Sequence, residues 1–104
     1  MVIAFDFDET LTDIRMQRFA RKCVRERNDV WVVTARRSGV HNKDLVEVLN
    51  KIGLTEMKVI YTNDKPKIEL IQSINADIYI DNITTEFYSI SNHTNTIPLL
   101  FTKQ

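Results

Sequence analysis

The stretch AFDFDETLTD, residues 4–13, decides the fold of this chain. Residues 2–7 (VIAFDF) predict a buried β-strand, yet Asp6 interrupts that strand and Asp8 follows directly after it. Burying a carboxylate costs free energy unless a partner compensates its charge. We therefore expect this strand to end at a site that requires negative charge.

The rest of the chain alternates between strand patterns and helix patterns. Continuous apolar and β-branched runs predict strands covered on both faces, and apolar residues at helical spacing predict the helices between them. The expected strands are 2–7, 30–34, 58–61, 77–81 and 97–101, and the expected helices include residues 16–23, 45–52, 66–74 and 84–90. This alternation predicts an α/β domain with one open parallel sheet and helices on both faces. Pro98 cannot donate to a strand ladder and predicts an edge position for the last strand.

Length and composition predict one compact domain over residues 1–104. The chain has 104 residues, of which 43% are hydrophobic, and this is enough for a single core. No apolar run approaches the ~20 residues of a membrane span, and the N-terminus lacks the features of a signal peptide. Cys23 is the single cysteine, so no internal disulfide is available. These features predict a cytoplasmic location and no membrane partner.

Charge is unevenly placed although the formal net charge is zero. Residues 15–27 (RMQRFARKCVRER) hold six of the fourteen Lys and Arg residues. One interpretation is a solvated helix face, and another is a basic rim that attracts a phosphorylated or nucleic-acid substrate. The zero net charge argues against a dedicated nucleic-acid binder.

Polar side chains gather where the predicted strands end. Because parallel strands point the same way, their carboxyl ends share one edge of the sheet, where ligands bind in such folds. Carboxylates ~4 Å apart repel by roughly 4 kcal/mol at an effective dielectric near 20, and a divalent cation removes this cost. Oxygen ligands with room for water favour Mg²⁺, together with a phosphate. The residues at these ends are Asp6, Asp8, Thr34, Lys65, Lys67 and Asp81.

Four motifs in this order resemble those of the haloacid dehalogenase superfamily of phosphohydrolases. They are DFDET, VVTAR, a lysine at a helix start, and YIDN, and the resemblance spans residues 2–86. It implies a three-layer, Rossmann-like open sheet of about five strands in the order 3-2-1-4-5. It also implies a Mg²⁺-dependent phosphomonoester hydrolase that works through an aspartyl-phosphate intermediate.

The resemblance assigns the acids to distinct roles. Asp6 would be the nucleophile, and Asp8 the general acid and then the general base. Relatives that cleave carbon–halogen bonds lack the second acid, so Asp8 favours a phosphatase. Mg²⁺ would be held by the side chains of Asp6 and Asp81 and by the backbone carbonyl of Asp8. Asn82 stands where many relatives have a further acid, which implies weaker metal binding or compensation by Glu86.

A lysine should neutralise the phosphoryl group and the nucleophile. Lys65 and Lys67 both qualify by position. Lys65 precedes Pro66, and a Lys-Pro pair at this point resembles many relatives. Lys65 is therefore favoured as the catalytic lysine, and Lys67 is left as a surface or substrate-binding residue.

Three further residues are candidates near the substrate. Thr34 would donate its hydroxyl to a phosphoryl oxygen. Arg36 suits bidentate phosphate recognition, with a structural salt bridge as the rival interpretation. Thr10 is placed beside the substrate, although a role in steadying the loop after the first strand is favoured for it.

Short connections predict a family member without a cap domain. The segment between Asp8 and Thr34 has room for only one helix. The segment between Thr34 and Lys65 has room for one helix and one strand. An uncapped site is open to a small phosphoester, a phosphoprotein or a nucleic-acid end, or it borrows a lid from an oligomer partner.

Two rival functions remain open at this point. A receiver-like phosphoacceptor also uses an acid cluster, a Thr and a Lys on a parallel sheet, but its acceptor Asp follows the third strand, where this chain has Tyr61-Thr62-Asn63. A degenerate phosphate-binding module is the other rival. The presence of both Asp6 and Asp8 argues against it.

Overall fold

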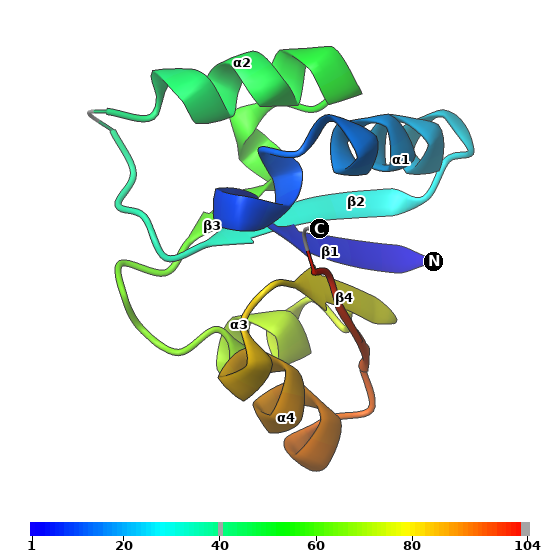
Figure 1. Cartoon of the computed structure of the whole chain (residues 1–104), viewed down its shortest axis with the longest axis vertical. Coiled ribbons are helices and arrows are strands. Elements are labelled where there is room, and N and C mark those ends of the chain that lie inside the picture. Colours follow the sequence, from blue (N-terminus) through cyan, green and yellow to red (C-terminus); the bar gives the residue numbers. More distant parts are fainter. Residues whose placement is uncertain (40, 103–104) are drawn as a thin grey trace.

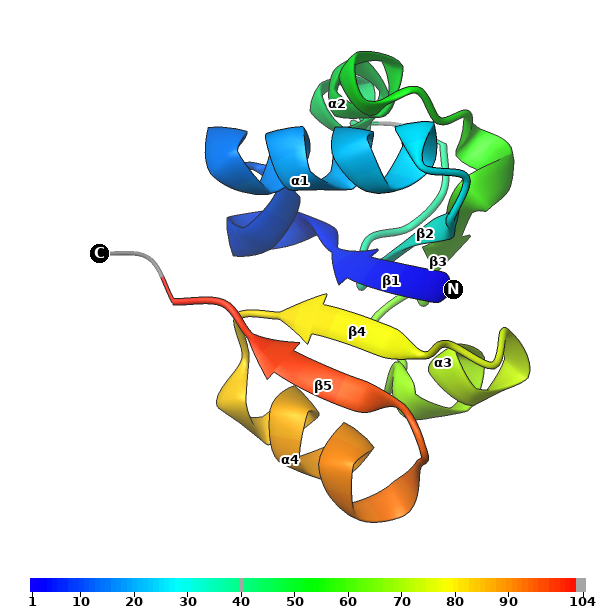
Figure 2. The same ribbon diagram turned by 90° about the vertical axis from the view of Figure 1, so that its right-hand side faces the viewer.

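The chain folds around an open sheet of five parallel strands in the order β3-β2-β1-β4-β5. This is a computed structural model, and it describes residues 1–39 and 41–102. Figure 1 and Figure 2 show β1 in the middle of the sheet. The predicted fold class and strand order are therefore confirmed. The strands are β1 (Val2–Asp6), β2 (Asp29–Thr34), β3 (Val59–Tyr61), β4 (Ile78–Asp81) and β5 (Ile97–Leu100).

Helices cover both faces of the sheet and make three layers. In Figure 1, α1 and α2 lie above the sheet and α3 and α4 lie below it. Each layer buries its own hydrophobic cluster, one built around Phe5 and Leu49 and the other around Tyr79 and Ile71. The central strand is covered on both faces, which explains its nearly continuous apolar sequence. The helices are α1 (Ile14–Arg25), α2 (Lys43–Ile52), α3 (Ile68–Ser73) and α4 (Thr84–His93), and a short 3₁₀ turn η2 spans Glu56–Lys58.

The turn after β1 differs from the sequence-based expectation. The first strand was predicted to run through Phe7, but it ends at Asp6, and a kinked turn, η1 (Phe7–Leu11), follows, in which Asp8 and Glu9 depart from helical dihedral angles. Glu9 has φ of 63° inside this turn, a left-handed conformation that L-residues adopt rarely. The turn buries Phe7 and Leu11 in the core while Asp8 and Glu9 stay exposed. In an extended strand, successive side chains alternate between faces, so Glu9 would lie on the same face as the buried Phe7 and Leu11 rather than being exposed like Asp8.

Neither connection around the motifs contains an added domain. Within the described residues, η1, α1 and β2 follow β1 directly, and α2, η2 and β3 lead from β2 to α3. The expected absence of a cap in these connections is thus confirmed. No described helix combines the length and the apolar character needed to cross a membrane.

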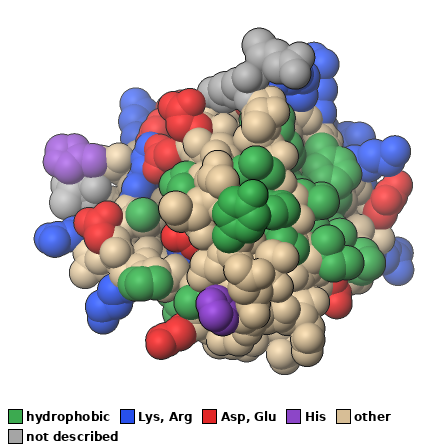
Figure 3. All heavy atoms as spheres, turned by 60° about the horizontal axis from the view of Figure 1, so that its bottom comes forward, with side chains coloured by type: hydrophobic (Ala, Val, Ile, Leu, Met, Phe, Trp, Pro, Cys, Tyr) green, Lys and Arg blue, Asp and Glu red, His purple; other side chains and the backbone are tan. Residues whose placement is uncertain are grey.

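The β5 side of the molecule is apolar on its surface. Pro98 lies in β5, and β5 is an edge strand, as predicted. Figure 3 brings the lower side of Figure 1 forward and shows hydrophobic side chains gathered near its centre. Large hydrophobic residues are exposed on β5, on α4 and directly before α4, and they belong to neither core cluster. They are Ile83, Tyr88, Ile97, Leu99 and Leu100.

Candidate functional site

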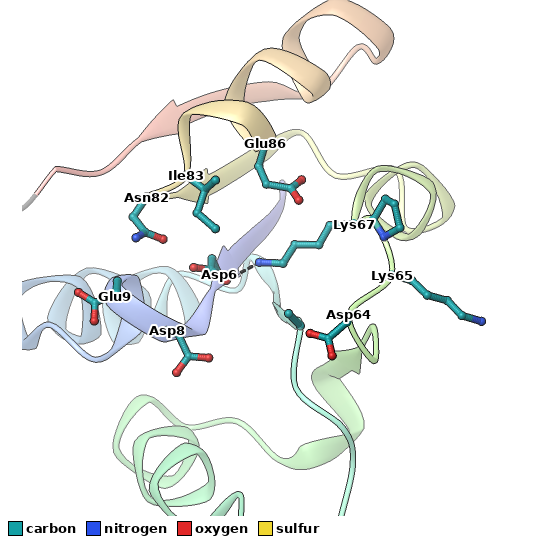
Figure 4. Close-up of a pocket in the computed structure, with 11 residues that line it drawn as sticks. Asp6, Asp8, Glu9, Asp64, Lys65, Lys67, Asn82, Ile83 and Glu86 are labelled. Carbon is teal, nitrogen blue, oxygen red and sulfur yellow. Dashed lines mark hydrogen bonds and ion pairs between the residues drawn. The ribbon is translucent and has the colours of Figure 1, made fainter.

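A pocket of about 370 Å³ opens at the carboxyl ends of the central strands. Asp6 ends β1 and forms its floor, and Asn82 follows β4. Figure 4 shows Asp6 between Asp8 on one side and Lys67 on the other. Acids dominate the wall, as expected for polar residues that follow parallel strands ending at one edge. The acids that line it are Asp6, Asp8, Glu9, Asp64 and Glu86, and the cations are Lys65 and Lys67.

Lys67 connects two buried acids, Asp6, which lines this pocket, and Asp81, which lies behind the lining residues. Its Nζ donates to Oδ1 of Asp6, to the Tyr79 hydroxyl at 3.0 Å and to Oδ2 of Asp81 at 3.5 Å. The Tyr79 hydroxyl in turn donates to Oδ2 of Asp81. Asp6, Lys67 and Asp81 expose only 4%, 4% and 2% of their surface, so little water screens these charges. Two buried carboxylates thus face a single buried ammonium.

The position of the lysine corrects the sequence-based expectation. Lys65 was favoured, but Figure 4 shows its side chain pointing away from Asp6, whereas Lys67 points toward it. Asn63 and Asp64 both adopt left-handed backbone conformations, with φ of 58° and 64°, and this double turn reverses the chain just before the two lysines. Lys67 then immediately precedes α3, which directs it to the centre of the sheet. The lysine at the predicted nucleophile is therefore Lys67.

Asp6 is held in an environment that opposes its ionisation. Burial raises the pKa of Asp6 to about 7; Lys67 opposes the rise, and the charges of Asp81 and Asp8 add to it. Burial also raises the pKa of the half-buried Glu86. In both cases burial is the main cause of the raised pKa, and the neighbouring charge of Asp81 adds to the rise while Lys67 opposes it. A carboxylate kept basic in this way is a candidate for a functional group.

This raised pKa predicts that the stability of the metal-free protein depends on pH. Asp6 has an ordinary pKa of 3.8, against about 7 in the folded chain. Below about pH 4 it is protonated in both states and costs nothing, and the folded state loses stability as the pH rises toward 7. We expect Asp6→Asn to remove this loss. The difference between the free energies of unfolding of Asp6→Asn and wild type should therefore grow in favour of the variant as the pH rises. Between about pH 4 and about pH 8, in EDTA, this growth should be on the order of a few kcal/mol. Urea titrations would contradict this if the difference were the same at both pH values.

Asp81 is fixed by the backbone that follows it. Its Oδ1 accepts hydrogen bonds from the backbone N–H groups of Asn82, at 2.6 Å, and Ile83, at 3.0 Å. Tyr79 and Asp81 are two residues apart in β4, so their side chains lie on the same face of the strand. This spacing is a sequence signal that could have revealed Tyr79, which the motif pattern did not single out.

The amide of Asn82 lies between the two buried carboxylates. One of its terminal atoms is 3.1 Å from Oδ2 of Asp6 and 3.1 Å from Oδ1 of Asp81. With nitrogen in that place the amide donates to both acids. The opposite orientation would set the amide oxygen against two carboxylate oxygens, so the donor orientation is the one that these contacts favour. Mg²⁺ takes oxygen ligands at about 2.1 Å, and the carboxylates and the amide oxygen of these residues are ligands of that type, so their chemistry suits the ion.

A conventional metal cluster is not present in the described residues. Within 1–39 and 41–102, no group of three or more His, Cys, Asp or Glu side chains is arranged to hold an ion. The expected Mg²⁺ ligands, Asp6 and Asp81 by side chain and Asp8 by its backbone carbonyl, include only two side chains. Any binding would therefore rely on the backbone, Asn82 and water as well.

Asp8 lines the pocket and forms a salt bridge with Arg36, which does not line it. The guanidinium of Arg36 donates to Asp8 Oδ2 at 3.1 Å and Oδ1 at 2.7 Å, and it makes two further hydrogen bonds to Asp44. Four of the five N–H groups of an arginine are thus occupied. The salt-bridge interpretation of Arg36 describes this arrangement, and a phosphate would have to displace a carboxylate to bind it.

Thr34 and Thr10 are buried beside the pocket rather than on its wall. Thr34 is fully buried, its Oγ1 accepts the backbone N–H of Arg36 at 3.3 Å, and Ala35 lines the pocket at this point. The Thr10 hydroxyl donates to Oδ2 of Asp6 at 3.4 Å. Thr10 therefore contacts the predicted nucleophile and steadies η1. Direct substrate contacts of either threonine stay predictions.

No family model matches this chain, and a search of curated proteins found no match.

Proposed function

We propose that this protein is a Mg²⁺-dependent phosphomonoesterase that works through an aspartyl-phosphate, as in the haloacid dehalogenase superfamily. The observation that supports this most is the buried pair of Asp6 and Asp81 against one lysine, with Asp6 and Lys67 lining an open pocket. Such a buried set with excess negative charge is costly to fold, so a role beyond stability is the better explanation. The second acid, Asp8, lines the same pocket.

The proposed reaction has two steps in which Asp6 and Asp8 alternate. A carboxylate oxygen of Asp6 attacks phosphorus, the P–O bond to the leaving group breaks, and the leaving oxygen takes both the electron pair and a proton from Asp8. Water then attacks the same phosphorus and gives its proton to Asp8. The P–O bond to Asp6 breaks, which releases phosphate and restores the carboxylate.

Lys67 supports this chemistry by its charge. Its ammonium group contacts Oδ1 of Asp6, which leaves Oδ2 on the side of Thr10 and Asn82. A buried ammonium next to the nucleophile favours the ionised carboxylate. It also stabilises the negative charge that develops on the phosphoryl oxygens. Lys67 is therefore the lysine that we assign to the reaction, in place of Lys65.

Asp6, Asp81, the backbone carbonyl of Asp8 and the Asn82 amide oxygen would hold Mg²⁺. The ion supplies charge neutralisation between two anions that must approach each other. In this proposal Asn82 exchanges its donor orientation for its acceptor orientation when the ion binds. It contributes no charge, so the affinity should be modest.

Metal binding can be tested without activity. Mg²⁺ added to EDTA-treated protein is expected to raise Tm by about 5 °C or more at saturation, because the ion binds the folded chain and relieves repulsion. Asp81→Asn should lose most of this shift, whereas Asp29→Asn, at the opposite end of the sheet, should keep it. A shift of the same size in all three proteins would contradict the assigned ligands.

The substrate class is a phosphomonoester that reaches an open pocket. No described segment covers the pocket, and its lining includes the exposed residues Glu9, Asp64 and Lys65. Both small phosphoesters and the phosphorylated end of a macromolecule fit this access. The basic residues of α1 are the one described feature that we cite for a nucleic-acid end as the substrate.

The direct test is turnover of p-nitrophenyl phosphate with Mg²⁺ and with EDTA. Multiple turnovers that require the metal support the proposal. A stable phosphorylated protein without turnover would instead favour a receiver-like phosphoacceptor. Absence of both phosphorylation and turnover, across a panel that includes nucleotides and oligonucleotide ends, would overturn the enzyme function.

A further inference from the structure

Asp44, which no motif singled out, is linked to Asp8 through Arg36. Nη1 and Nη2 of Arg36 donate to Oδ1 and Oδ2 of Asp44 at 2.7 and 2.9 Å, while Nε and Nη2 hold Asp8. The guanidinium is thus bidentate toward both carboxylates. Paired hydrogen bonds of this kind fix orientation as well as distance.

Arg36 is held along its whole length. Its backbone N–H donates to Thr34 Oγ1 at 3.3 Å, and its carbonyl accepts from the Asn63 N–H at 3.3 Å. Its guanidinium carbon lies 4.8 Å from the centre of the Phe7 ring, a distance typical of a cation–π contact. These contacts leave few orientations to the side chain.

Asp44 anchors the other end of this linkage. It is the second residue of α2, and a helix N-terminus favours a carboxylate. The Arg36 guanidinium holds the pKa of Asp44 below its usual range, and backbone N–H groups of α2 add to this. Of the three linked residues, only Asp8 lines the pocket.

The orientation of Asp8 keeps its carboxylate apart from the nucleophile, with both of its oxygens bound by Arg36. Figure 4 shows its carboxylate pointing away from Asp6. In phosphoryl transfer the attacking and leaving oxygens lie roughly in line, so an acid that serves the leaving oxygen must stand apart from the nucleophile. The side chains of Asp8 and Asp44 are 53% and 59% exposed, and exposed ion pairs contribute little to folding stability. Orientation of Asp8 explains the linkage better than stability does.

We propose that Asp44 is a positioning residue, which through Arg36 fixes the Asp8 carboxyl where it protonates the leaving-group oxygen. This inference rests on the phosphomonoesterase function proposed above. As Asp6 forms its bond to phosphorus, the bond to the leaving oxygen breaks and the proton passes from Asp8 to that oxygen. The second step, attack by water, returns a proton to Asp8 held in the same place.

The test compares two esters of similar size under saturating Mg²⁺. p-Nitrophenolate leaves as a stable anion, whereas phenolate is more basic and depends more on a proton. For Asp44→Asn we expect kcat/KM to fall about ten-fold or more for phenyl phosphate and less than about three-fold for p-nitrophenyl phosphate. Asp44→Glu should restore part of the loss. Asp29→Asn is the matched control: it breaks an exposed pair with Lys58, 2.6 Å long, and should change neither ester.

The outcomes separate this inference from the proposed function. An equal fall for both esters would mean that Asp44 acts on structure or on phosphate binding, and this would overturn the positioning role. Unchanged or increased phenyl phosphate hydrolysis would overturn it too, an increase meaning that Arg36 holds Asp8 out of use. Wild-type protein that is neither phosphorylated nor turns over any ester of the wider panel, these two included, would overturn the phosphomonoesterase function and this inference with it.

Discussion

Replacing Asp6 with asparagine is expected to lower the kcat of p-nitrophenyl phosphate hydrolysis by about three orders of magnitude or more. The amide cannot form the bond to phosphorus, and removal of a nucleophile costs effects of this size or larger in hydrolases. Steady-state kinetics with saturating Mg²⁺ would measure the loss. Circular dichroism and urea titration would show whether the variant keeps the wild-type fold.

Trapping of the intermediate gives this prediction a second readout. Wild-type protein quenched in acid during turnover should carry a phosphoryl group that is lost in alkali, and Asp6→Asn should carry none. Asp29→Asn, which alters an exposed ion pair at the start of β2, should resemble wild type in both assays. Turnover that survives Asp6→Asn would remove the nucleophile from the proposal.

The two lysines are expected to differ strongly in their effect on catalysis. Lys67→Met should lower kcat/KM by about 10²–10³-fold, because it removes the buried cation at Oδ1 of Asp6. Lys65→Met should change it by less than about three-fold, since that side chain points away from Asp6. The two variants are the same substitution two residues apart, so each serves as the control for the other.

Loss of Lys67 also leaves two buried carboxylates without their cation, so the variant has to be checked for folding. Lys67→Arg keeps the charge and helps to separate chemistry from stability. A folded Lys67→Met protein with wild-type kinetics, or an equal loss in Lys65→Met, would contradict the assignment of Lys67.

The sequence predicted which strand ends would meet, but not how their side chains would orient. Acids after buried strands were expected at one edge because parallel strands end on the same side of the sheet, and the strand order itself was implied by the family resemblance. The choice between Lys65 and Lys67 depends on the left-handed turn at residues 63–64. Asn and Asp tolerate that conformation, but nothing in their pattern requires it, so this detail came only from the folded chain.

The same limit explains why the sequence did not predict Asp44. Asp44 and Asp8 are far apart in the chain, and each reaches Arg36 only after α2 has packed and η1 has turned. A lone Asp in the first turn of a helix is common for reasons of helix stability alone. Contacts of this kind join segments that are far apart in the chain, and no short stretch of a single sequence predicts them.

The order of the strands divides the site between two halves of the polypeptide. Strands β3, β2 and β1 come from residues 2–61, while β4 and β5 come from residues 78–100 and join along β1 through Ile3–Ile78, Ala4–Tyr79 and Phe5–Ile80. Asp6 belongs to the first half, whereas Lys67 and Asp81 belong to the part that follows. A folding intermediate made of the first half alone would hold Asp6 without its countercharge, so the cluster assembles only when the last two strands dock.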